Sequence, residues 1–103
     1  MAKLILAVVP TFEVAVPIPV PGKPAVPVKF TMRGRSREEF QSFLDAMTGK
    51  TNAEVIMECA TGWELDDPFD AEHVEKLDRT YLGAARAVLD AYMAQVTGAR
   101  LGN

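Results

Sequence analysis

The side chains best suited to catalysis or metal binding lie around His73, the one histidine in 103 residues, which stands beside Glu72 and near Asp70. A histidine acts as a general base or metal ligand when further ligands or a nucleophile accompany it. The chain has no second histidine, and its single cysteine, Cys59, does not stand at ligand spacing from His73. We therefore expect a partly exposed helix residue, with no catalytic role and no metal.

Three aspartates, Asp66, Asp67 and Asp70, form a second group that could bind an ion. Carboxylates suit Ca²⁺ and Mg²⁺, but this run lacks the glycine and the terminal glutamate of a calcium-binding loop. Asp67 precedes Pro68 and Asp70 precedes Ala71, and an aspartate in such a position can cap a helix N-terminus. Helix capping is the simpler interpretation of both.

Cys59 would need a lowered thiol pKa to act as a nucleophile, yet the residues before it, Ile56, Met57 and Glu58, are apolar or acidic. It is expected to be a small core residue. The sequence contains no glycine-rich phosphate loop, no dinucleotide-binding fingerprint and no Ser/His/Asp set. We therefore predict that the chain is not an enzyme and binds no cofactor.

The composition is that of an ordinary globular protein, with 49% hydrophobic and 24% charged residues. A chain of 103 residues is long enough for one hydrophobic core, so residues 1–103 are expected to form a single domain. A net charge of −3 argues against a nucleic-acid binder. Residues 1–52 carry seven Lys/Arg against four Asp/Glu, and residues 53–103 carry four against ten, so the front is basic and the back acidic.

The first residues could be mistaken for a secretion signal, because Lys3 precedes a short apolar run. Pro10 interrupts that run after six residues, and the alternating Phe12, Val14 and Val16 that follow are typical of a strand. Nowhere do about 18 apolar residues follow one another, so no membrane span is predicted. One unpaired cysteine fits a reducing compartment.

Residues 1–33 form a β-rich region with prolines at positions 10, 17, 19, 21, 24 and 27. These prolines exclude a helix and disfavour a central strand, because each removes a backbone donor; edge strands or an irregular ribbon stay open. The turn signal Pro21-Gly22-Lys23-Pro24 would fold Phe12–Val20 back on Ala25–Met32 as a hairpin. One face of the second strand is apolar and should be buried: Val26, Val28, Phe30 and Met32.

Residues 36–98 are predicted to form three to four helices, which makes the chain an α+β protein. Ser36 with Glu39, and Thr51 with Glu54, have the spacing of a capping box, so a helix should begin at each. The first helix should reach Gly49 with this apolar stripe: Phe40, Phe43, Leu44 and Met47. The second should end near Gly62 and contain Val55, Ile56, Cys59 and Ala60.

The last part of the chain predicts two more helical segments. Phe69 before Asp70, with Val74 further on, matches a hydrophobic staple and a cap for a helix from Ala71 to about Arg79. The final and longest helix has an apolar residue at every third or fourth position until Gly98: Leu82, Ala85, Val88, Leu89, Tyr92, Met93 and Val96. No proline separates the two segments, so one continuous rod stays open.

With no catalytic chemistry to assign, protein contact becomes the expected role of the apolar and aromatic side chains. Small domains with spare strand edges and helix faces rich in Met and Tyr commonly bind proteins. The candidate contact residues are Phe40, Phe43, Met47, Trp63, Leu82, Tyr92 and Met93. Burial within the monomer is the alternative for each of them, and a tryptophan at the end of a short apolar helix is more often core.

Several stretches together resemble a known family. In the front they are the valine-proline repetition from Pro17 to Phe30 and the basic patch Arg33-Gly34-Arg35-Ser36-Arg37. In the C-terminal half they are Gly62-Trp63-Glu64, Pro68-Phe69 and the run from Gly83 to Arg100. In order and extent they resemble the tail assembly chaperones of long-tailed bacteriophages, over nearly the whole chain.

The resemblance implies an assembly factor that is absent from the finished particle. We expect this factor to form homo-oligomers and to act in the host bacterial cytoplasm. It implies that this factor coats the tape-measure protein and helps the tail-tube protein polymerise around it. It supplies no catalytic residue. Members of the family are made in two lengths by a ribosomal frameshift, and a chain ending at Leu101-Gly102-Asn103 would be the shorter form.

Two other hypotheses stay open beside the chaperone. One is a structural virion subunit, such as a tail-tube or head-tail connector component, whose β-rich front would join a neighbour's sheet. The other is a small DNA-binding regulator in which Arg33, Arg35 and Arg37 clamp a phosphate. Three arginines against a net charge of −3 make the regulator the weakest of the three hypotheses.

Overall fold

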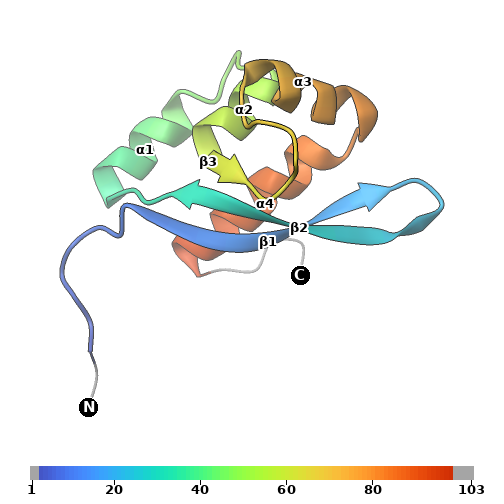
Figure 1. Ribbon diagram of the computed structural model, residues 1–103. Coiled ribbons are helices and arrows are strands. Elements are labelled where there is room, and N and C mark those ends of the chain that lie inside the picture. Colours follow the sequence, from blue (N-terminus) through green and yellow to red (C-terminus); the bar gives the residue numbers. More distant parts are fainter. Residues whose placement is uncertain (1–2, 99–103) are drawn as a thin grey trace.

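A computed structural model describes residues 3–98 and shows a three-stranded antiparallel sheet with four helices (Figure 1). The α+β prediction is confirmed. The elements are β1 (Thr11–Val20), β2 (Lys23–Arg33), α1 (Arg37–Asp45), α2 (Asn52–Cys59), β3 (Ala60–Trp63), α3 (Ala71–Thr80) and α4 (Ala84–Thr97). Within residues 3–98, none of the helices combines the length and apolar character needed to cross a membrane. Residues 101–103, to which the shorter-form expectation refers, lie outside the described part.

The predicted hairpin of β1 and β2 is confirmed, and its register explains how it accommodates prolines. The two strands pair antiparallel, with Pro17 opposite Pro27. Opposite residues in such a pair alternate between hydrogen-bonded and non-hydrogen-bonded positions, and two facing prolines fit only the second kind because neither has an N–H. The even-numbered residues, such as Val16 and Val28, therefore form the ladder. The odd-numbered residues direct their backbone groups outward.

β3 adds a third strand where β2 carries no proline, between Phe30 and Met32. Glu64 reinforces the junction, since its N–H donates to the Lys29 carbonyl at 3.0 Å and its carboxylate accepts from the Lys29 N–H at 3.1 Å. The backbone groups of odd-numbered Lys29 thus point toward β3, as the register requires. β2 is a central strand only over this short stretch, so Pro27, which lies outside it and opposite Pro17, costs no sheet hydrogen bond.

The prediction that the second helix contains Ala60 and ends near Gly62 is wrong. α2 ends at Cys59, and the backbone of Ala60 is extended, with φ −126° and ψ 157°. Ala60 pairs with Met32 and Gly62 pairs with Thr31, so a strand replaces the last expected turn of helix. The spacing of apolar residues does not predict this strand, because its hydrogen-bonding partner, the edge of β2, lies about 30 residues earlier in the chain.

The first two helices begin where the capping boxes predict. Ser36 and Thr51 each accept a hydrogen bond from the backbone N–H three residues on. Glu39 and Glu54 accept in return from the cap N–H groups, at 2.7 and 2.8 Å. These backbone hydrogen bonds lower the pKa of both glutamates, because they favour the charged form. Local sequence alone therefore sets these two starts.

Asp70 caps α3 as predicted, and its carboxylate accepts from the His73 N–H at 2.9 Å. The expected capping role of Asp67 is wrong, because no helix begins at Pro68. The Asp67 carbonyl instead accepts a hydrogen bond from the indole N–H of Trp63 at 2.7 Å. This bond closes the loop between β3 and α3 and satisfies the one polar atom of the tryptophan.

Two helix boundaries differ from the expected ones. α1 ends at Asp45, so Met47 lies in the turn before α2 and not on the helix. α3 ends at Thr80 and α4 begins at Ala84, so Leu82 lies in the link between two separate helices. Apolar spacing indicates which residues can share a helix face, but it does not say where the backbone hydrogen bonds stop.

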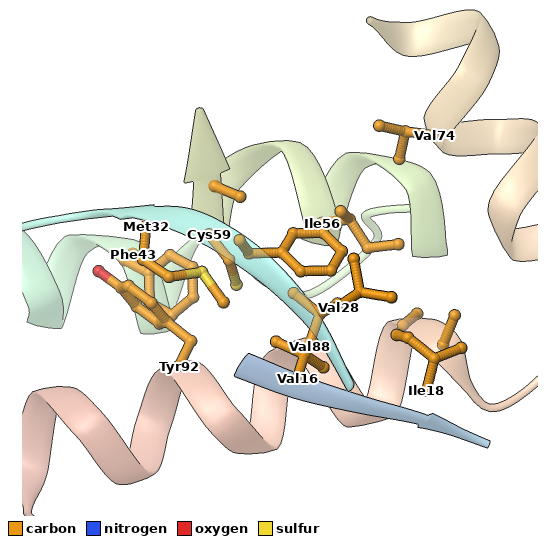
Figure 2. Packing of buried hydrophobic residues seen from close by; sticks show 14 residues of the cluster. Val16, Ile18, Val28, Met32, Phe43, Ile56, Cys59, Val74, Val88 and Tyr92 are labelled. Atoms are coloured by element: carbon orange, nitrogen blue, oxygen red, sulfur yellow. The ribbon is translucent and has the colours of Figure 1, made fainter. Parts of the chain in front are cut away.

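The core lies between the sheet and the helices (Figure 2). The largest fully buried side chains come from both long strands and three helices: Val16, Phe30, Met32, Ile56, Cys59, Val74, Val88 and Tyr92. The predicted inner face of β2 is confirmed for Val28, Phe30 and Met32. Val26 was expected on the same face but is 49% exposed, because the hairpin projects past the helices at its tip (Figure 1).

Candidate protein-contact surfaces

A run of exposed apolar side chains precedes the sheet, in residues 3–10, which we call the N-terminal arm. Leu4, Ile5 and Leu6 are 81%, 82% and 94% exposed, and Val8 and Val9 are also exposed. Figure 1 shows the arm leaving the body of the molecule ahead of β1. Contiguous exposed apolar side chains commonly mark a site of protein contact.

The arm is fixed at its base by Pro10 and Gly34. The Gly34 N–H donates to the Pro10 carbonyl at 2.9 Å. A Cβ atom on Gly34 would lie 1.5 Å from the Val9 carbonyl oxygen, so only glycine permits this approach of two backbones. Residues 3–9 have no hydrogen bond to any other part of the described chain. The arm is therefore held at one end only.

A second set of exposed apolar residues, which we call the tip surface, comprises Pro19, Val26 and Leu82. Leu82 is 84% exposed, and Pro19 is exposed as well. A Cβ atom on Gly83 would lie 2.9 Å from Cγ of Pro19, so the link between α3 and α4 packs on the hairpin directly beside Leu82. Val26 lies opposite Ile18, the residue before Pro19. The tip surface and the arm thus lie at opposite ends of the hairpin.

The Arg35 guanidinium contacts side chains from three helices. It donates to the Tyr92 hydroxyl at 2.8 Å and to the Glu58 carboxylate at 3.3 Å, and it lies 4.5 Å from the centroid of the Phe43 ring. The Tyr92 hydroxyl donates in turn to the Arg33 carbonyl at 2.8 Å. Burial raises the pKa of Tyr92, so this donor stays protonated at neutral pH. Arg35 is thus a paired structural charge and not a free phosphate ligand.

The structure divides the seven predicted contact residues into three groups. Leu82 presents most of its side chain to solvent. Four are partly buried against the core: Phe40, Met47, Trp63 and Met93. Phe43 and Tyr92 are only 4% and 0% exposed, and their rings meet edge to face with centroids 5.3 Å apart. Of the seven, only Leu82 therefore belongs to one of the two exposed apolar surfaces.

The arm carries contact candidates that the sequence pattern does not single out. Its signal is the unbroken run of six apolar residues, 4–9, that Pro10 ends. A run of this length fits a buried strand as well as an exposed segment. A buried strand differs from an exposed segment only in whether another part of the fold covers it. Residues 4–9 by themselves do not show whether such a covering surface exists.

Cys59 and His73, the residues considered for catalysis, are a buried core residue and the partner of a helix cap. Cys59 is fully buried, and burial raises the pKa of its thiol to about 12, which keeps it protonated and unreactive. His73 Nδ1 lies 2.7 Å from an Asp70 carboxylate oxygen; this hydrogen bond raises the pKa of His73. Within residues 3–98, no three His, Cys, Asp or Glu side chains are grouped so that they could hold a metal ion.

Comparison with known proteins identifies the family. A family model described as phage tail assembly chaperone matches residues 1–103, the whole chain. The chain belongs to the phage tail assembly chaperone family. The resemblance seen in the sequence is thereby confirmed. No curated protein and no solved structure matches the chain.

Membership of this family implies interaction with other tail proteins. In this chaperone the arm and the tip surface lie at opposite ends of one hairpin.

Proposed function

We propose that this chain is a non-catalytic chaperone that binds the tape-measure protein in the host bacterial cytoplasm and helps the tail-tube protein assemble around it. The observation that carries the proposal is the match of the entire chain to the tail assembly chaperone family. The two exposed apolar surfaces support it, because a protein that holds a partner temporarily needs apolar area that its own core leaves uncovered.

We place the tape-measure contact at the tip surface. A long helical partner presents its apolar residues as a stripe, and such a stripe docks on a shallow apolar surface. Pro19 supplies a rigid ring, and its close packing on Gly83 fixes the position of the neighbouring Leu82. A surface that is already ordered loses little conformational entropy when a partner binds, which favours contact there.

Several copies of the chain are proposed to act together on one tape-measure protein. A partner much longer than this 103-residue chain offers many successive stretches of helix, and one copy covers only one of them. Copies that also contact each other would gain affinity through the increased effective concentration of neighbours.

Co-purification tests the proposed tape-measure contact. The tagged chain is co-expressed with the tape-measure protein encoded in the same phage genome, and the captured amount is measured. The double variant Val26→Asp/Leu82→Asp should capture roughly tenfold less or worse, because two exposed apolar contacts become charged and each contact is worth about 1 kcal/mol. Leu6→Asp in the arm leaves the tip surface unchanged, so it is the matched control and should capture clearly more than the double variant.

Two outcomes would contradict this assignment in different ways. Equal capture by the double variant and the wild type would remove the tip surface as the contact. Failure of the wild type to capture any tape-measure protein would remove the proposed function itself. Mass spectrometry of purified particles adds an independent check, since an assembly chaperone should be missing whereas a structural virion subunit would be present in many copies.

A further inference from the structure

We infer that the N-terminal arm of one copy of this chain pairs, as an added strand, with the open edge of β1 in a second copy. The inference rests on the self-association in the proposed function and not on tape-measure binding. It identifies the two surfaces that meet and the kind of bond between them, namely a backbone ladder flanked by apolar side chains.

The acceptor is the outer edge of β1, whose only strand partner in the described chain is β2. The register directs the backbone groups of Thr11, Glu13 and Ala15 outward, and all three residues are exposed. Pro17 is the first residue along this edge that has no N–H to offer. The open part of the edge therefore spans residues 11–16, and proline closes it toward the tip.

The arm matches this edge in length. Residues 4–9 are six apolar residues between Lys3 and Pro10, and the open edge is also six residues long. Residues 3–9 have no backbone hydrogen bond elsewhere in the described chain, and a ladder would supply one set of partners. β3 is the other edge strand of the sheet, but with four residues it is too short to pair with the whole run.

The whole run of residues 4–9 cannot pair with the edge of its own β1. An antiparallel return needs a turn of about two residues or more, and only Pro10 separates residue 9 from Thr11. A parallel return needs a crossover of about a dozen residues. The bond between the Pro10 carbonyl and the Gly34 N–H also ties the chain at this point. An edge that takes the whole run therefore belongs to another molecule.

Pairing would also extend the apolar layer beside β1. Phe12 and Val14 face the helices but are only partly buried, as are Leu89 and Met93 of α4, the helix that packs on β1. The side chains of an added strand alternate between the two faces of a sheet. Half of the six arm residues would therefore lie on this apolar side, where their burial would favour association.

Each copy has one arm to donate and one edge to accept. Such a contact is heterologous, because two different surfaces of the same chain meet, and it generates a ring or an open row of molecules rather than a closed pair. An open row would place successive copies side by side along a long partner.

Light scattering of the purified full chain, run on a sizing column over a range of concentrations, tests the inference. Leu6→Asp places a charge in the arm. Ala15→Pro removes one outward N–H, as Pro17 does naturally, and leaves the ladder to β2 intact. The mass of the wild type should rise above that of one 11.2 kDa chain, and both variants should stay at one chain. Leu82→Asp changes a strongly exposed leucine that lies outside the arm and outside the edge of β1, so this variant should assemble like the wild type.

Mixing the two variants sharpens the test. Leu6→Asp keeps a working edge and Ala15→Pro keeps a working arm, so an equal mixture should give a species of two chains and nothing larger. A wild type that stays at one chain, a variant that assembles fully, or a mixture that stays at one chain would each overturn the inference. Circular dichroism verifies folding, and Thr11→Pro replaces Ala15→Pro if that variant unfolds. If arm-to-edge pairing fails but Leu6→Asp, which stays at one chain, still captures the tape-measure protein, only the inference is wrong and the proposed function stands.

Discussion

The N-terminal arm and α4 are both strongly apolar, yet the arm is exposed to solvent and α4 is largely buried. Leu4 and Leu6 in the arm are 81% and 94% exposed, whereas Val88 and Tyr92 in α4 are fully buried. The apolar residues of α4 recur at helical spacing and pack on β1, while those of the arm follow one another without a surface to cover them. Apolar composition therefore does not decide burial; a second surface does.

The largest expected effect compares the same kind of change in the two regions. Val88→Asp should lower the free energy of unfolding by about 4 kcal/mol or more, because it deletes core packing and buries an unpaired carboxylate. Leu6→Asp should change it by less than about 0.5 kcal/mol, because the side chain is already in water. Urea unfolding followed by circular dichroism measures both. Similar losses in the two variants would mean that the arm is packed on the body.

An intermediate effect is expected at the junction between arm and body. Gly34→Ala should destabilise the protein by about 2 kcal/mol, because the new Cβ would overlap the Val9 carbonyl oxygen and push the arm away. Gly62→Ala is the matched control, since the nearest atoms to its Cβ, those of the Thr31 side chain, lie 4.0 Å away. Unfolding midpoints and hydrogen exchange of the residue 34 amide report the difference. Equal midpoints would show that the close approach is not needed.

The smallest effect is expected from the exposed pair Asp70 and His73, which tests how little a polar surface contact adds beside the buried apolar residues. Hydrogen bonds from the His73 backbone and side chain lower the pKa of Asp70, so its stabilisation is present above pH 3.8 and fades as the pH falls through the lowered pKa. The bond to Asp70 raises the pKa of His73, so that stabilisation is present below pH 6.5 and fades as the pH rises through the raised pKa.

The two pH dependences together define a window. The difference in unfolding midpoint between the wild type and His73→Gln should be largest between pH 3.8 and 6.5 and should shrink on both sides. Thermal unfolding from pH 3 to 9 measures it. A difference that does not change with pH would show that the pair is not linked to stability.

Local signals in the sequence predict much of the secondary structure. The turn from Pro21 to Pro24 and the boxes at Ser36 and Thr51 depend only on residues within four positions of each other, and all three are found where expected. The Asp70 cap belongs to the same class. Such features could be predicted because every atom that takes part is contributed by one short segment.

Which of the candidate contact residues are exposed could not be predicted from the sequence. Helical spacing places Phe43 and Tyr92 on apolar faces but cannot say whether another element covers those faces. In the fold Tyr92 packs on Phe43 and Phe12, which lie in separate parts of the chain. Leu82 is not buried, because α3 ends before it and the link to α4 leaves its side chain in solvent.

The sequence by itself determined the α+β class, the hairpin, the helix starts and the family, because turns, caps and motif order are properties of neighbouring residues. Only the tertiary structure decided that residues after Cys59 become β3, that α4 is largely covered, and that the arm is bare. These outcomes depend on which surfaces meet, and a surface that meets another is built from residues far apart in the chain.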